Sequence, residues 1–74
     1  MLLETRRIER RLPSPAERRR LRLAARLTQP ELAAFLGVGA PALCRWENGT
    51  RTPRGELAAR YDGALATIRA EVDR

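Results

Sequence analysis

The chain has 74 residues and a formal net charge of +6, because fifteen basic residues, all of them arginine, outnumber nine acids. A chain of this length forms one small domain that buries only about 60% of its unfolded surface, and its charge favours a polyanionic partner, with nucleic acid ahead of an anionic membrane. Since there is no histidine and a single cysteine, Cys44, we expect no internal disulfide, no metal site, no cofactor and no enzyme activity.

Residues 1–12 mix arginines with a few aliphatic residues, and they form either a short helix or a loose basic arm. Only Leu2 and Leu3 precede the first charges, which is too short an apolar stretch for the core of a signal peptide. No later run approaches the roughly 18 apolar residues of a membrane span. We therefore expect a cytoplasmic protein with no membrane association.

A first helix is expected to begin at Pro15. Pro13 disfavours helix at the residue before it, while Ser14 supplies an N-cap and Glu17 places an acid at the positive end of the helix. The helix continues to about residue 27. We expect Leu21, Ala24, Ala25 and Leu27 to face the core, and Arg18, Arg19, Arg20 and Arg26 to lie mostly in water.

Two short helices follow, separated by a turn that contains two glycines. Thr28 is a good N-cap and Glu31 stands at the spacing of a capping box, so a second helix is expected over residues 29–36. Gly37 can adopt the positive φ that often ends a helix. A third helix is then expected over residues 40–47.

The last expected helix follows a turn at residues 50–55. Its apolar residues recur three or four positions apart, as on one face of an amphipathic helix, and Gly63 is a point where it would kink or split. Four or five helices without an alternating strand pattern predict a small all-α domain over residues 13–74, with residues 1–12 as its arm. The apolar residues of the last expected helix form a stripe, which serves either the core or a dimer interface. This stripe consists of Leu57, Tyr61, Leu65, Ile68 and Val72.

The second and third helices, with the short turn between them, have the layout of a helix-turn-helix. In that motif the second helix of the pair enters the major groove of DNA. An ordinary helical hairpin in a small bundle has the same layout, so spacing and charge alone leave both interpretations open.

Residues 27–49, LTQPELAAFLGVGAPALCRWENG, carry a more specific pattern. They combine a Leu-Thr-Gln start, an alanine in the first helix of the pair, a glycine turn and a Trp-Glu-Asn-Gly end. This combination resembles the helix-turn-helix of phage repressor and Cro-like proteins, the XRE family, and the likeness extends over about residues 13–68. The resemblance implies a lambda-repressor-like fold and a transcription regulator that binds double-stranded DNA, either as a monomer or as a homodimer.

The resemblance also implies which residues meet DNA. Arg45 is the one strong hydrogen-bonding reader of bases on the third helix. Three residues before it on this helix offer a thymine methyl group only apolar contact. They are Ala40, Pro41 and Ala42. Contacts with DNA phosphates are implied for Gln29, Asn48, Thr50, Arg51 and Arg54.

Other matching positions are structural. Arg22 and Glu47 match a pair that joins the first helix to the end of the third by a partly buried ion pair. Arg26 stands where the family often has a helix-ending glycine, which costs about 1 kcal/mol if this residue must be left-handed. Cys44 is expected near the DNA-facing side, as a small filler residue or as a thiol sensor. The residues implied to pack the two helices together are Ala33, Val38, Leu43 and Trp46.

The apolar edge at residues 40–42 departs from the family pattern, in which polar or basic side chains are usual. One Arg–guanine pair supplies about 1–3 kcal/mol of discrimination, which is too little to select a site in a genome. Either two half-sites or further arginines must therefore supplement Arg45, and the arm offers Arg6, Arg7, Arg10 and Arg11. The same edge supports an alternative function, a protein-interaction module of antitoxin or adaptor type with weak or no specific DNA binding. A membrane binder would need a larger apolar face than residues 1–12 provide.

Overall fold

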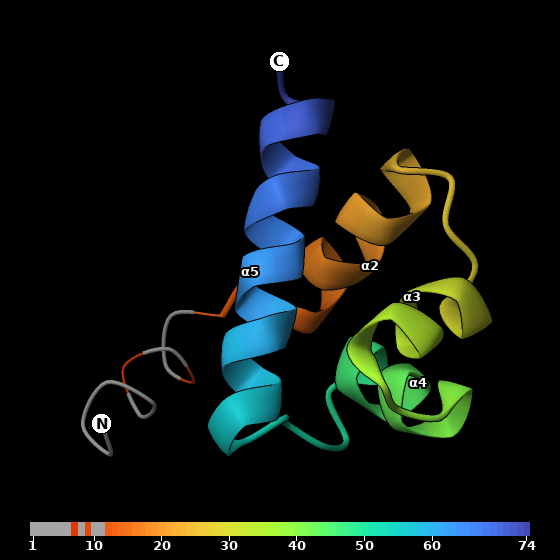
Figure 1. Cartoon of the computed structure of the whole chain (residues 1–74), viewed down its shortest axis with the longest axis vertical. Helices are drawn as coiled ribbons and strands as arrows, with labels where there is room; N and C mark the ends of the chain where they lie inside the picture. The colour runs from red at the N-terminus through yellow and green to blue at the C-terminus, as the bar shows by residue number, and fades with distance from the viewer. Residues whose placement is uncertain (1–6, 8, 10–11) are drawn as a thin grey trace.

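The computed structural model of the chain describes residues 7, 9 and 12–74. Within residues 12–74 it has four α-helices and no β-strand: α2 (Pro15–Ala24), α3 (Gln29–Leu36), α4 (Ala40–Asn48) and α5 (Gly55–Val72). Figure 1 shows the long helix α5 with α2 packed beside it, and α3 and α4 together near its first half. The expected all-α class is confirmed. The last helix runs through Gly63 without a break, and α4 is one residue longer than expected.

Capping side chains determine where α2 and α3 begin. Ser14 Oγ accepts a hydrogen bond from the Glu17 amide at 3.2 Å. Thr28 Oγ1 accepts from the Glu31 amide at 3.2 Å, and Glu31 Oε1 accepts in return from the Thr28 amide at 2.8 Å. These bonds satisfy N–H groups that have no partner inside the helix. Gly37, with a φ of 75°, then ends α3 and starts the turn to α4.

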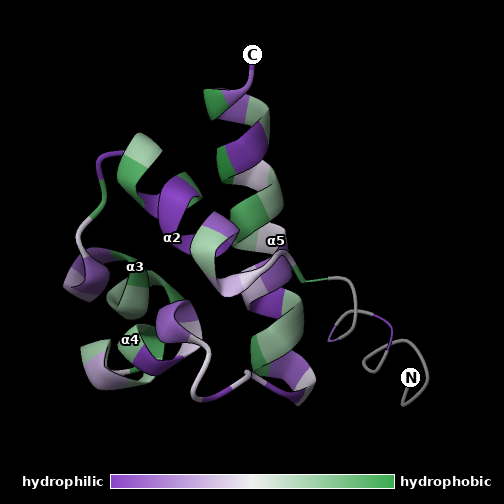
Figure 2. Ribbon diagram, turned by 180° about the vertical axis from the view of Figure 1, so that it is seen from behind, coloured by the Kyte–Doolittle hydropathy of each residue, from purple (hydrophilic) through white to green (hydrophobic). Residues whose placement is uncertain are grey.

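The hydrophobic core lies between α5 and the three shorter helices. The rings of Trp46 and Tyr61 pack with their centroids 5.1 Å apart, which joins α4 to α5. Hydrophobic and hydrophilic residues alternate along α5 in Figure 2, and its apolar stripe is buried at Tyr61, Leu65 and Ile68. The stripe therefore serves the core. The buried apolar residues are Leu12, Leu21, Leu32, Ala33, Leu36, Leu43, Trp46, Ala58, Tyr61, Leu65 and Ile68.

Two of the expectations for α2 are wrong. Ala24, expected to face the core, is exposed. Arg18, expected to lie in water, is only 6% exposed. Its guanidinium donates hydrogen bonds to the carbonyl oxygens of Pro13 at 2.7 Å and Trp46 at 3.0 Å. A cation is well placed there, because the carbonyl groups of the last helical turn of α4 carry partial negative charge.

The backbone is left-handed where α2 ends. Among the described residues, Arg26 is the only one other than glycine with a positive φ, which is 60°. The Arg26 amide donates to the carbonyl of Leu23 at 2.9 Å, and the Leu27 amide donates to that of Arg22 at 3.1 Å. These bonds close the helix end, but a residue with a Cβ atom pays about 1–2 kcal/mol for this conformation.

The chain just before α2 is attached to the start of α5. Glu9 Oε2 accepts a hydrogen bond from the Gly55 amide at 2.9 Å, and Leu12 is buried in the core. Arg7 is exposed. The other arginines of the expected arm, Arg6, Arg10 and Arg11, lie outside the described residues, so the arm and its boundary after residue 12 stay predictions. None of the described helices is long and apolar enough to span a membrane.

Candidate nucleic-acid interface

The helices α3 and α4 form a tight pair joined by residues 37–39. Each buries one side against the rest of the domain, and between them Val38 is half-buried against the core. The Val38 amide donates to the carbonyl of Ala33 at 2.9 Å, which holds the turn against α3. The buried residues are Leu32, Ala33 and Leu36 on α3 and Leu43, Trp46 and Glu47 on α4.

The opposite face of α4 is open to solvent. Pro41, Arg45 and Asn48 are exposed and lie one helical turn apart, while Ala40 and Ala42 are half-buried beside them. The guanidinium of Arg45 has no hydrogen bond or ion pair within the described part of the chain. This face therefore presents one free cation on a largely apolar surface.

The loop after α4 is folded back onto the last turn of that helix. Asn48 Oδ1 accepts from the Thr50 amide at 3.0 Å and from Thr50 Oγ1 at 2.7 Å. The amides of Thr50 and Arg51 both donate to the carbonyl of Arg45, at 3.1 and 3.3 Å. Pro53 is buried, which anchors the far end of the loop. The loop is thus held in one shape by its own hydrogen bonds.

Three arginines line one cleft beside the exposed face of α4. Arg45 from the helix and Arg51 and Arg54 from the loop line a single cleft, together with Thr50 and Ala42. Arg51 and Arg54 are exposed, and neither makes an ion pair with a described residue. Clustered cations without internal counter-charges favour an external anion.

A buried ion pair ties α4 to α2. Arg22 donates from Nε to Glu47 Oε2 at 2.7 Å and from Nη2 to Glu47 Oε1 at 3.0 Å, and both side chains are at most 7% exposed. Hydrogen bonding to Glu47 raises the pKa of Arg22. Gln29, the first residue of α3, donates from Nε2 to Glu47 Oε1 at 3.2 Å. One carboxylate therefore links α2, α3 and α4.

A second cleft is lined by residues of α2, α3 and α4. Cys44, which is exposed, lines it together with Gln29 and three arginines. These are Arg19, Arg22 and Arg26. No group of three or more metal-binding side chains occurs among the described residues.

The chain matches the helix-turn-helix domain family over residues 16–74. It belongs to that family. Helix-turn-helix domains are typically non-enzymatic modules that bind DNA. Comparison with curated proteins and with solved structures found no match.

Within this helix-turn-helix domain, some of the residues singled out from the sequence line the two clefts, whereas Ala40, Pro41, Glu47 and Asn48 line neither. Arg45, Thr50, Arg51 and Arg54 share one cleft, and Gln29 lies in the other. Arg19 is exposed, as expected, but the sequence does not predict that it lines the same cleft as Gln29. No sequence signal marks that position, because it depends on how α2 and α3 are placed relative to each other in the fold.

Proposed function

We propose that this helix-turn-helix domain is a sequence-specific regulator of transcription, of the phage repressor and Cro-like (XRE) type, that binds double-stranded DNA in the cytoplasm, on the nucleoid. One observation carries the proposal: Arg45, Arg51 and Arg54 line one cleft along the open face of α4. Neutralisation of phosphates by such groups releases counterions from DNA and supplies much of the binding free energy.

In this proposal α4 lies in the major groove. The helix has nine residues, so it is roughly 13 Å long, which is comparable with a groove about 12 Å wide. The planar fork of Arg45 would pair with O6 and N7 of a guanine. The apolar edge beside it would contact thymine methyl groups through Ala40, Pro41 and Ala42.

Contacts with phosphates would set the register of α4 on the duplex. Thr50, Arg51 and Arg54 lie on the folded loop and would follow the backbone of one strand, together with Asn48. Gln29, which lines a different cleft from these residues, would contact a separate phosphate. Its bond to Glu47 supports this role, since it holds the Gln29 side chain against the end of the reading helix.

Selection of bound sequences from random duplex DNA tests this function. The selected duplex is then titrated against a scrambled one at two salt concentrations. We expect a motif that contains a guanine and a preference of about a thousandfold or more over scrambled DNA. Binding that is steeply salt-dependent but indifferent to sequence would overturn the specific readout, and an absence of binding would overturn the DNA interface itself. Arg74→Ala is the control for the loss of a charge outside the proposed interface, because it removes one charge at the far end of α5.

A further inference from the structure

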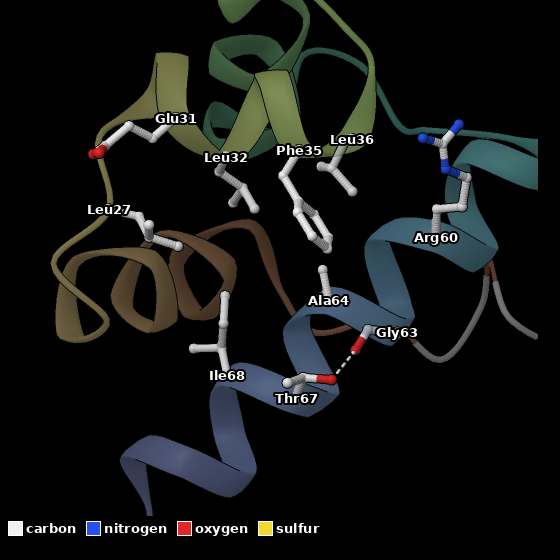
Figure 3. Close-up of a pocket in the computed structure, with 10 residues that line it drawn as sticks. All are labelled: Leu27, Glu31, Leu32, Phe35, Leu36, Arg60, Gly63, Ala64, Thr67 and Ile68. Carbon is white, nitrogen blue, oxygen red and sulfur yellow. Dashed lines mark hydrogen bonds between the residues drawn. The ribbon is translucent and has the colours of Figure 1, made fainter.

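An apolar groove with an exposed aromatic side chain lies between α3 and α5, away from α4 (Figure 3). Phe35 of α3 is 74% exposed, and in Figure 3 its ring points into the groove toward Ala64 of α5. Leu32, Leu36 and Ile68 line the groove and are buried. The only other large hydrophobic residue that is exposed in the described part of the chain is Leu23, at 54%.

The wall of the groove on α5 is built from small residues. Gly63 and Ala64 face Phe35 in Figure 3, and a Cβ atom added to Gly63 would meet nothing within 4 Å. The ring of Phe35 therefore remains largely uncovered by its own chain. Phenylalanine side chains bury large areas when they find a partner, and exposed apolar patches rimmed by polar groups often mark interaction sites.

The two ends of the groove carry opposite charges. Glu31 lies at one end, near Leu27 and Ile68, and Arg60 lies at the other (Figure 3). Glu31 uses Oε1 to cap α3, while Oε2 has no partner among the described residues. The guanidinium of Arg60 likewise has no hydrogen bond or ion pair with a described residue. An acid and a base at opposite ends of an apolar centre become complementary when the surface meets its own copy about a two-fold axis.

We propose that this groove is the interface of a homodimer, in which Phe35 seats on the groove of a second copy of the chain. Two-fold symmetry then places Glu31 of each copy opposite Arg60 of the other. No residue of α4 lines the groove, so both reading faces stay open in the dimer. Dimerisation does not rest on the proposed DNA-binding function, and the experiments that test it use no DNA.

The first experiment measures molar mass by sedimentation equilibrium, in the absence of DNA, from micromolar to millimolar chain concentration. We expect a reversible monomer–dimer equilibrium, as is usual for interfaces at the small end of the size range. Phe35→Ser should leave a folded monomer, whereas Leu23→Ser, a matched loss of an exposed apolar side chain, should dimerise like the parent. A parent chain that stays monomeric, or a dimer unaffected by Phe35→Ser, overturns the proposal.

A charge exchange tests the two-fold arrangement. Glu31→Lys and Arg60→Glu each place like charges opposite one another in a homodimer, so each should raise the dimer Kd by about tenfold or more. Mixed in equal amounts, the two variants should form a heterodimer of near-parental affinity, because both cross-pairs are again of opposite charge. A mixture that associates no better than its components overturns the arrangement.

Two controls keep the outcomes separate. Circular dichroism verifies that Glu31→Lys is folded, because this variant also loses half of the capping box of α3. Arg45→Ala should dimerise like the parent chain, because Arg45 does not line the groove. Loss of dimerisation in Arg45→Ala would place the interface on the α4 face and overturn the proposal, whatever the outcome of the DNA-binding experiments.

Discussion

The carboxylate of Glu47 and the guanidinium of Arg22 form a two-bond ion pair, at 2.7 and 3.0 Å, between the last turn of α4 and the last turn of α2. Both side chains are buried, and Gln29 and the carbonyl of Leu27 take up further hydrogen-bonding positions around them. Because each charge compensates the other away from water, neither can be removed alone without leaving an uncompensated buried charge.

We therefore expect Glu47→Ala to lower the free energy of unfolding by about 3–5 kcal/mol. That loss is a large part of the total for a small domain, which is about 5–15 kcal/mol. Urea denaturation followed by Trp46 fluorescence measures it. The control is Glu56→Ala, an exposed acid in the first turn of α5, which should change the urea midpoint little. A Glu47→Ala variant that unfolds at the parental midpoint would show that the ion pair adds no stability.

A second carboxylate gives the domain an acid-sensitive contact. Glu17 accepts hydrogen bonds from Arg20 at 2.6 and 2.8 Å and from Arg69 of α5 at 3.3 Å. The bond from Arg20 is the main reason that the pKa of Glu17 falls from 4.5 to about 2. A pKa lowered by folding stabilises the folded state above the unfolded pKa, and this contribution disappears as the pH falls through the folded value.

We expect the parent to be more stable than Glu17→Gln above pH 4.5, and the difference to shrink as the pH falls from there and to vanish below about 2. The effect should be small and should weaken in salt, because these side chains are exposed to solvent. Urea midpoints of the two proteins across this pH range measure it. A difference that stays constant with pH would contradict the assignment.

Arg26 offers a direct test of backbone strain. Because its φ is 60°, Arg26→Gly should relieve the clash of the Cβ atom and stabilise the domain by about 1 kcal/mol, after allowance for the greater freedom of glycine in the unfolded chain. Thermal unfolding should then shift upward by about 4–8 °C. Arg26→Ala is the matched control, since it removes the charge and keeps the strain. Equal melting temperatures for the two variants would argue against strain at this residue.

Arg45 and Arg51 should fail in different ways as DNA binders. Arg45→Ala should lose about 1–3 kcal/mol of discrimination at a guanine position. Arg51→Ala should weaken binding to all sequences alike and reduce the slope of log affinity against log salt by about one. Titrations of both variants with selected and scrambled duplexes over a salt series distinguish the two effects. Equal losses on both duplexes for both variants would refute this division of roles.

Local signals in the sequence predict the helices well. Thr28 and Glu31 are three residues apart, and their capping box forms with both of its hydrogen bonds. The length of α3 and the all-α class follow from such short-range patterns. The burial of Arg18 does not, because one of its two partners, the carbonyl of Trp46, lies 28 residues away and meets it only through the crossing of α2 with α4.

The candidate site, too, has features that the sequence predicts and features that depend on tertiary packing. The exposed edge of α4 follows from helical spacing once the helix-turn-helix is recognised, and Arg45 lies on it as expected. Arg45 shares a cleft with Arg51 and Arg54 because of the folded loop, which the sequence shows only as a turn. Phe35 illustrates the opposite difficulty. A phenylalanine within an apolar run is typical of a core residue, yet the rotation of α3 on α5 leaves it exposed.

The two faces of α4 separate the residues that hold the fold from those to which the proposed function assigns DNA preference. Leu43, Trp46 and Glu47 hold the helix in the domain, while Pro41, Cys44 and Arg45 face outward. Each outward position can accept a different side chain at little cost to the core, because surface substitutions usually change stability by less than about 0.5 kcal/mol. A library randomised at these three positions would consequently consist largely of folded proteins, so new target sequences can be sought by changing fewer than half of the residues of one short helix.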